Sequence, residues 1–354
     1  MADDTHRGAV TPPPASPADR SRRVVVGLLV ALGVMLVIAL VSGRYPIRLG
    51  DLADLLWRAV TAPGSLTHNA GETVLFRVRL PRLCAALMVG AALSGSGACY
   101  QAIFRNPMVD PSLLGVSAGA ALGAALGILF SVGVVGIQLL AFGSGLAAVG
   151  LTLLLSWLVS RQGENTLTLV LCGIVTGTLF SATLSLVKYL ADPYSKLPAI
   201  TYWLMGSLAA VNPADARGAA LATLVGTIPL VLLRWRINVL SFGDEEARAM
   251  GVNTRLIRGL VIAASTLMTA TAVSMSGMIG WVGLVVPHLA RMLVGPSFAV
   301  LLPVSILMGA LFLLTVDTVS RVAFAVEIPL GILTAIIGAP FFIYLLVRGR
   351  RGWA

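Results

Sequence analysis

The stretch RLPRLCAALMVGAALSGSGACYQAIFRNPMVDPSLLGVSAGA, residues 79–120, decides the fold of this chain. A charged RLPR opens it, and a long apolar run of small residues follows. A short polar segment, RNPMVDP, then interrupts that run before a second glycine-rich apolar run begins. An α-helix needs about 20 apolar residues to cross the bilayer core. The stretch therefore predicts two membrane helices joined as a hairpin by a tight polar turn.

The composition of the whole chain agrees with a membrane protein. Of its 354 residues, 57% are hydrophobic and 11% are charged, whereas soluble domains carry about 25% charged residues. Inside lipid every backbone N–H and C=O must be paired within its own segment, so the apolar runs should be helices. We expect an all-α, polytopic bundle of about ten transmembrane helices. The predicted spans are 24–42, 80–104, 112–131, 136–160, 166–190, 215–234, 255–277, 283–295, 299–322 and 329–348.

Charge and the chain ends indicate orientation. The formal net charge of +10 comes almost entirely from arginine, much of it beside membrane segments, where it sets topology; no nucleic-acid partner is expected. Residues 1–23 are Pro-rich and polar, which predicts a disordered tail. An even number of spans places both termini on one side, and the arginines near the tails favour the cytoplasmic side. The membrane domain is expected to cover 24–350.

Glycines at four-residue spacing suggest where helices approach closely. Such spacing puts small residues on one face of a helix and allows a neighbouring backbone to come near. This predicts helix packing at two sets of glycines: Gly115, Gly119, Gly123 and Gly127 in one span, and Gly173 and Gly177 in another.

Catalytic and metal-binding patterns are missing from the sequence. No G-x-x-x-x-G-K-[ST] motif occurs, and the chain has two lysines, Lys188 and Lys196. If ATP drives this protein, a separate subunit must bind it. The histidines and cysteines do not stand at metal-ligand spacing; they are His6, His68, His288, Cys84, Cys99 and Cys172. We therefore expect no catalytic residue, no metal site and no cofactor.

Residues 241–251, SFGDEEARAMG, predict a short capped helix between two spans, at about 243–251. Ser241 and Asp244 could form a capping pair, and Gly251 is placed to end the helix in a left-handed conformation. The acidic residues of the first turn and the basic residue near the end complement the helix dipole; they are Asp244, Glu245, Glu246 and Arg248. The segment is either a surface helix without a partner or a knob that docks into another protein.

Arginines gather near one predicted membrane surface. Arg77, Arg79 and Arg82 cluster at the start of the span at 80–104, and Arg321 lies near the end of the span at 299–322. They could anchor helix ends to lipid headgroups or receive an acidic docking partner. Asp317 stands four residues before Arg321 and can pair with it along one helix face. A gradient-driven secondary transporter, which favours ionisable groups near mid-membrane, is an alternative function; a membrane-embedded enzyme is disfavoured.

Five motifs together resemble the FecCD-type (BtuC-like) permease subunits of type II ABC importers for ferric siderophores, haem and cobalamin. They are the stretch at 79–120, YWLMGSL at 202–208, FGDEEARAMGVN at 242–253, SGMIGWVGLVVPHLARMLVG at 276–295 and EIPLGILTAIIGAPFFIYLL at 327–346. The resemblance covers roughly 24–350. Met108 and Val109 depart from the commoner Leu and Ala, and the Pro-rich tail is not shared.

The resemblance implies a type II importer permease that works in the inner (cytoplasmic) membrane by alternating access. Its implied partners are an ABC ATPase subunit, a periplasmic substrate-binding protein and a second permease subunit. The resemblance leaves open whether that subunit is a second copy or a different chain; a homodimer is expected because this permease is a single, unfused unit. Arg79, Arg82 and Arg321 are then expected to be sockets for binding-protein carboxylates. The helix at about 243–251 becomes the coupling helix that contacts the ATPase. An iron–siderophore complex is the first expectation for the cargo, with haem and cobalamin open.

Overall fold

The computed structural model describes residues 17–62, 69–159 and 166–349 of the chain. Within these ranges every regular element is helical. Seven helices are long and apolar enough to cross a membrane, and three shorter apolar helices accompany them. The predicted all-α bundle with about ten spans is confirmed, and the chain is described below as a multi-pass membrane protein.

The spans begin and end close to where the apolar runs place them, because helix caps and polar loops bound each run. Asn212, for example, caps its helix in a full capping box with Asp215, an arrangement that satisfies free N–H groups of the first turn. The ten helices are α1 (Pro17–Val41), α4 (Leu80–Ile103), α5 (Val116–Leu129), α6 (Gly133–Val159), α7 (Thr166–Leu190), α9 (Pro213–Leu232), α12 (Thr254–Ser276), α13 (Val282–Val294), α14 (Phe298–Val322) and α15 (Leu330–Gly349).

The expected boundary of the amino-terminal tail is corrected. Residues 17–23, predicted to belong to a disordered tail, form the first turns of α1. Asp19 in the first turn is favourable at a helix N-terminus, and a membrane helix can continue as a polar helix beyond the apolar core. Residues 1–16 lie outside the described residues.

The structure also contains helices that hydropathy did not predict. They are α2 (Leu49–Thr61), α3 (Ala70–Glu72), η2 (Thr73–Arg79), η3 (Pro111–Leu114), α8 (Lys196–Leu204), α10 (Arg234–Leu240) and α11 (Asp244–Ala249). The one-turn α3 and the π-helical η2 lead directly into α4, so that helical backbone runs from Ala70 to Ile103. Of these additional elements, α11 alone was expected.

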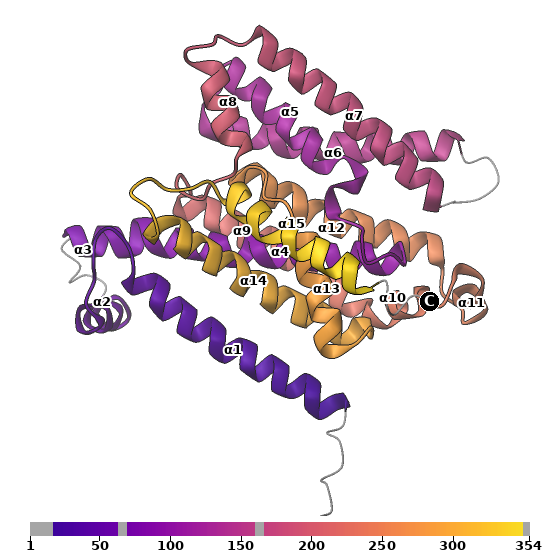
Figure 1. Ribbon diagram of the computed structural model, residues 1–354, viewed down its shortest axis with the longest axis horizontal. Helices are drawn as coiled ribbons and strands as arrows, with labels where there is room; N and C mark the ends of the chain where they lie inside the picture. The colour runs from indigo at the N-terminus through magenta and orange to yellow at the C-terminus, as the bar shows by residue number, and fades with distance from the viewer. Residues whose placement is uncertain (1–16, 63–68, 160–165, 350–354) are drawn as a thin grey trace, which may run out of the picture.

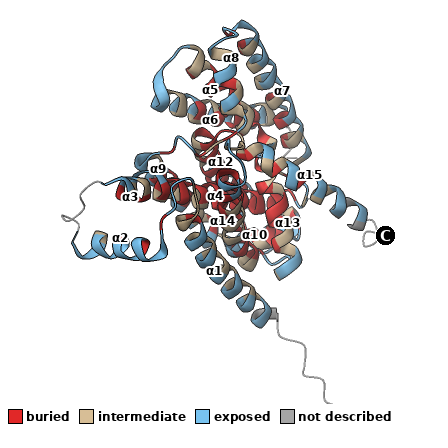
Figure 2. Ribbon diagram, turned by 60° about the vertical axis from the view of Figure 1, so that its left-hand side comes forward, coloured by how far each residue is buried: buried red, intermediate tan, exposed pale blue. Residues whose placement is uncertain are grey.

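The helices form two groups (Figure 1). In the larger one α4 occupies the centre, packed against α9, α12, α13 and α14. Figure 2 shows the buried residues concentrated along α4, α12 and α14. In the smaller group α5, α6, α7 and α8 pack on one another. Contacts of α12 with α5 and α6 join the two groups.

The expected hairpin between the first two runs of the opening stretch does not form. After α4 the chain passes through η3, and Gly115 adopts a φ of 87° that redirects the backbone into α5. This left-handed conformation is readily available to glycine. α5 then packs mainly on α6 and α7 rather than on α4, because other helices already surround α4.

Two glycine pairs bring α4 against its neighbours. A Cβ atom on Gly90 would overlap the carbonyl oxygen of Gly309 in α14, and a Cβ on Gly309 would overlap the carbonyl oxygen of Gly90. A Cβ atom on Gly97 would overlap the carbonyl oxygen of Gly283 in α13. Since no side chain separates these backbones, the helices approach as closely as their main chains allow.

The predicted glycine ladder lies against neighbouring backbones as well. Cβ atoms on Gly119 and Gly123 would lie within 3 Å of α6 atoms, and one on Gly173 would press on the carbonyl of Leu113. A Cβ atom on Gly127 would lie 3.0 Å from Ile137 of α6. Gly115 and Gly177 lie close to each other, but Gly115 belongs to the turn before α5 and not to the helix itself.

Candidate functional site

The candidate functional residues divide between the two ends of the bundle (Figure 1). At one end, here called the α2 end, α1 and α14 finish and α4 begins. At the other, the α11 end, α4 finishes, α12 begins and the short helices α10 and α11 lie. A cavity opens between these two ends. The three places are described in turn.

Two arginines and two carboxylates form an ion-paired cluster at the α2 end, buried except for one partly exposed carboxylate. Asp317 on α14 is 0% exposed. One of its oxygens accepts from Arg82 Nε at 2.9 Å, and the other accepts from Arg321 Nε at 3.1 Å. Arg82 also donates through both terminal nitrogens to Glu327, at 2.9 and 3.2 Å. Such a two-pronged guanidinium–carboxylate pair is strong and directional.

Arg79 belongs to the same region but has a different partner. It donates to the backbone carbonyls of Leu40, Val41 and Tyr45, where α1 ends and the link to α2 begins. The carbonyls of Leu40 and Val41 are among those that a helix end leaves without an intrahelical donor. Arg79 therefore fixes the chain that leaves α1.

The structure brings together the three arginines expected to be docking sockets. Their side chains, however, are buried and not open to a partner. Arg79, Arg82 and Arg321 are between 4% and 8% exposed, and each already has partners within the chain. An open socket at the surface is therefore not what this structure shows. The predicted pair of Asp317 with Arg321 is confirmed. The pairing of Arg82 with Asp317 and Glu327 was not predicted.

At the α11 end, α11 is a short helix that an ion pair joins to the bundle. Asp244 at its first residue accepts from Arg258 Nη2 of α12 at 3.0 Å. Ala247 is buried beneath the helix, whereas the side chains of Glu245, Glu246 and Arg248 are exposed. α11 is thus in direct contact with α12.

The caps of α11 are partly as predicted. Gly251 follows the helix with a φ of 78°, the left-handed conformation expected of it. The expected capping pair of Ser241 with Asp244 does not form: Gly243 is the capping residue, and Ser241 Oγ donates to the carbonyl of Asn238. Asp244 is instead engaged by Arg258, which lies 14 residues further along the chain.

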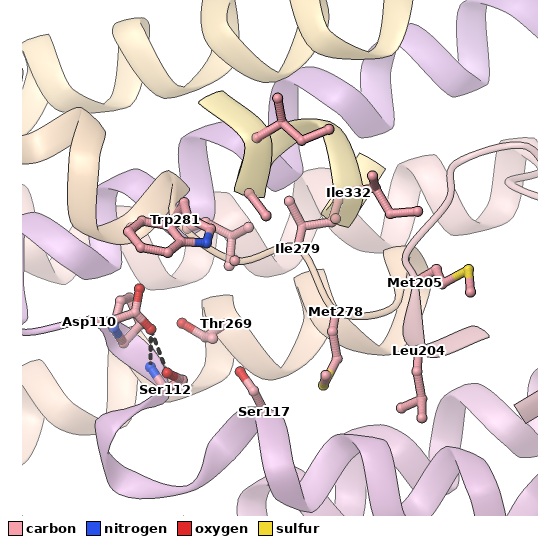
Figure 3. Close-up of a pocket in the computed structure, with 17 residues that line it drawn as sticks. Asp110, Ser112, Ser117, Leu204, Met205, Thr269, Met278, Ile279, Trp281 and Ile332 are labelled. Carbon is pink, nitrogen blue, oxygen red and sulfur yellow. Dashed lines mark hydrogen bonds between the residues drawn. The ribbon is translucent and has the colours of Figure 1, made fainter. Parts of the chain in front are cut away.

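A cavity of about 580 Å³ lies between α4, α8, the turn from α12 to α13, and α15. Figure 3 shows Asp110 and Ser112 on one side of it and Met278, Met205 and Leu204 on another. Asp110 Oδ1 accepts from the backbone N and the hydroxyl of Ser112, at 2.8 and 2.5 Å. The polar groups of the lining are this pair, Ser117 and Thr269; most other lining side chains are apolar.

Trp281 forms one wall of this cavity in an unusual backbone conformation. Its φ of 71° is in the left-handed region, which residues other than glycine seldom adopt. Gly338 of α15 leaves room for the indole, since a Cβ there would lie 2.6 Å from Trp281. Phe342 of the same helix meets the indole edge-on at 6.0 Å between ring centroids. The sequence offered no signal for this cavity, because its lining comes from six separate segments.

Comparisons with known proteins agree with this architecture. Residues 29–348 match the FecCD transport family. The chain is 40% identical to the molybdate import system permease protein MolB of Haemophilus influenzae, over 94% of this chain and 98% of that protein. It is 44% identical to an iron chelatin transport system permease protein of Helicobacter pylori, over 78% of this chain and 83% of that protein.

A solved structure extends the likeness to three dimensions. A chain from a metal-chelate type ABC transporter in an inward-facing conformation superposes with a TM-score of 0.82 at 39% sequence identity, covering 92% of this chain and 99% of that chain. Two results therefore agree: a family match along nearly all of the described spans, and close relatives in both sequence and structure. This chain belongs to the FecCD transport family and is the membrane permease of an ABC importer.

Proposed function

We propose that this permease moves an iron–siderophore complex across the inner membrane by alternating access, driven by a separate ATPase subunit that contacts α11. The observation that carries the proposal is the attachment of α11. This helix exposes Glu245, Glu246 and Arg248, and it is ion-paired to α12, whose far end borders the cavity. A partner that displaces α11 therefore acts on a helix that reaches the cavity wall.

The proposed orientation places the α11 end in the cytoplasm, with both termini. Arg20, Arg22 and Arg23 begin α1 at this end, and Arg234 and Arg236 lie in α10; cytoplasmic segments carry such an excess of arginine. The ATPase then binds from the cytoplasm, and a periplasmic binding protein docks at the α2 end. A second copy of this single, unfused permease completes the dimer that the family resemblance implies.

Docking of the binding protein at Arg79, Arg82 and Arg321 remains part of the proposal, with one change that the geometry requires. Because these guanidinium groups are already paired, a partner carboxylate could reach Arg82 by displacing Glu327. The Glu327 side chain is 28% exposed, whereas that of Asp317 is 0% exposed. Exposed arginines at the same end, Arg44, Arg48 and Arg77, could supply further contacts.

The cavity supports an organic metal chelate as cargo. Ligand sites for organic molecules are mainly apolar with a few placed polar groups, as in the 580 Å³ cavity beside Trp281. Cationic side chains are the strongest partners of a small oxyanion, and the described lining residues include neither lysine nor arginine. The relatives named for iron chelatin and for a metal chelate point the same way. MolB makes molybdate the second candidate cargo.

The test is uptake into proteoliposomes that contain this permease, its ATPase and its binding protein. We expect radiolabelled ferric siderophore to accumulate only with ATP, and labelled molybdate to remain outside. Accumulation of molybdate alone would show that the cargo is molybdate and not a ferric siderophore, while the ATP-driven importer function would stand. Uptake that proceeds without ATP but collapses with an ion gradient would instead support a gradient-driven secondary transporter and overturn the proposal.

A separate prediction follows from the proposed coupling role of α11. Asp244→Asn removes the charge that Arg258 contacts and should loosen α11 from α12. We expect ATP hydrolysis by the assembled complex to continue while cargo moved per ATP falls several-fold. The measurement is the ratio of uptake to phosphate release in the same proteoliposomes. Asp51→Asn removes an exposed carboxylate at the α2 end and is the matched control; an unchanged ratio in Asp244→Asn would contradict the role.

A further inference from the structure

The helix α2 has a face that nothing in the described chain covers. In Figure 1 most spans run across the view, whereas α2 is seen almost along its axis, and Figure 2 shows it from the side. α2 therefore lies across the direction of the spans. Its place is at the point where α1 ends and η2 leads into α4.

Three kinds of side chain occupy three separate sectors of α2. Leu52 and Leu55 are buried against Ile47 and Leu75. An exposed apolar sector follows the helical spacing of three and four residues, and consists of Leu49, Ala53, Leu56, Trp57 and Val60. A polar sector at the same spacing consists of Asp51, Asp54, Arg58 and Thr61. The buried sector lies between the other two, so the exposed apolar and polar sectors face different directions.

The apolar sector is strongly exposed. Leu49 is 62% exposed, Trp57 69% and Val60 82%. A helix with a continuous apolar stripe, a charged opposite side and an aromatic residue is the type that lies in the plane of a membrane interface. Tryptophan in particular favours the level of the lipid headgroups.

The polar sector is suited to water. Arg58 Nη2 pairs with Asp54 Oδ2 at 2.7 Å, one helical turn away, and both side chains are about half exposed. Both charged groups keep contact with water, as is usual for exposed ion pairs, which contribute little to stability. With the apolar sector in lipid, this pair would face the aqueous side.

Two further features relate the position of α2 to the part of the surface that faces lipid. Arg79 binds the carbonyls of Leu40, Val41 and Tyr45, which determines how the chain turns from α1 toward α2. α1 itself exposes a long apolar surface that includes Val30, Val34 and Ile38. In a membrane protein such a surface meets lipid acyl chains, so the lipid boundary continues from α1 to the level of α2.

We propose that α2 is an interfacial anchor whose sector of Leu49, Ala53, Leu56, Trp57 and Val60 inserts into the lipid leaflet at the α2 end. Its ligand is the lipid surface: acyl chains beneath the apolar sector and headgroups around Trp57. The anchor holds the link between α1 and α4 at a fixed depth. This role is independent of the cargo and of the ATPase.

The test measures the surroundings of α2 by spin labelling. Single cysteines at Val60→Cys and Leu49→Cys report on the apolar sector, and Asp51→Cys and Asp54→Cys on the polar sector. The parent carries Cys84→Ala, Cys99→Ala and Cys172→Ala. If that parent fails to fold, the same changes are made in the native chain, where Cys99 and Cys172 are buried and the unmutated protein supplies the blank. The full-length protein is placed in nanodiscs of phosphatidylcholine and phosphatidylglycerol.

We expect labels in the apolar sector to collide readily with oxygen, which concentrates in lipid, and rarely with a water-soluble nickel chelate. Labels in the polar sector should show the reverse, with a several-fold difference in the ratio of the two accessibilities. High nickel accessibility in both sectors would show that α2 is surrounded by water. Low accessibility to both reagents at Val60 and Leu49 would show that protein, such as a second copy, covers the sector. Either result overturns the proposal.

Discussion

Asp317→Asn should lower the free energy of unfolding by about 3–5 kcal/mol, the usual cost of removing one partner from a buried ion pair. Asp317 is fully buried and serves Arg82 and Arg321 at once. Asparagine keeps one acceptor oxygen but turns an NH₂ group toward the second guanidinium, so two donors face each other. Two buried positive charges then lack their shared carboxylate. Thermal unfolding of the purified variant in nanodiscs measures the effect.

The matched control is Asp54→Asn, which breaks an ion pair that is about half exposed. Exposed helix pairs contribute about 0.3–0.5 kcal/mol, so this variant should unfold close to the parent. Glu327→Gln should fall between the two, because the Glu327 side chain is partly exposed. Equal shifts in Asp317→Asn and Asp54→Asn would show that the buried cluster does not hold α4 and α14 together.

Gly90→Val is expected to be the most damaging change in the helix packing. The new Cβ would overlap the backbone of Gly309, and a backbone cannot rotate aside as a side chain can. Overpacking costs about 1–3 kcal/mol and sometimes more; a main-chain clash at the centre of the bundle should reach or exceed the upper value. The measurement is the fraction of expressed protein that elutes as a single species, followed by its unfolding temperature.

Gly33→Val tests whether valine itself is the cause. Gly33 lies in α1, and a Cβ there would meet no atom within 4 Å. This variant should therefore express and unfold like the parent. A Gly90→Val protein that remained equally stable would show that α4 and α14 can separate at their crossing without loss of the fold.

Much of the fold was predictable from the sequence because each apolar run is bounded by polar or charged residues. All ten predicted spans occur as apolar helices. The pairing of those helices was not predictable, as the failed hairpin of α4 with α5 shows. Lipid-facing and protein-facing surfaces are equally apolar, so hydropathy does not indicate which helix contacts which.

The close crossing of α4 with α14 did leave a signal in the sequence. Ala86, Gly90, Ser94 and Ala98 are small residues at four-residue spacing on α4, the same pattern that was noticed in α5. Ser94 Oγ donates to the carbonyl of Ser305 on α14 at 2.8 Å, beside the Gly90–Gly309 contact. A search for small residues in general, rather than for glycine alone, would have found this face.

The buried arginine cluster was beyond the reach of local patterns. Asp317 and Arg321 are four residues apart, and their pairing was predicted from that spacing. Arg82 is separated from Asp317 by 235 residues and from Glu327 by 245. No periodicity connects positions so distant, so Arg82 could be placed near a membrane surface but not assigned its partners.

The length of α12 has a mechanical consequence. Its 23 residues make a rod of about 34 Å at 1.5 Å per residue, comparable to the thickness of the hydrocarbon layer. Arg258 attaches α11 near one tip, and Met278 and Trp281 follow the other tip at the cavity wall. A rocking motion about the middle of such a rod moves its tips in opposite directions. A displacement at the α11 tip would thus reshape the cavity at the other tip with the helix itself intact.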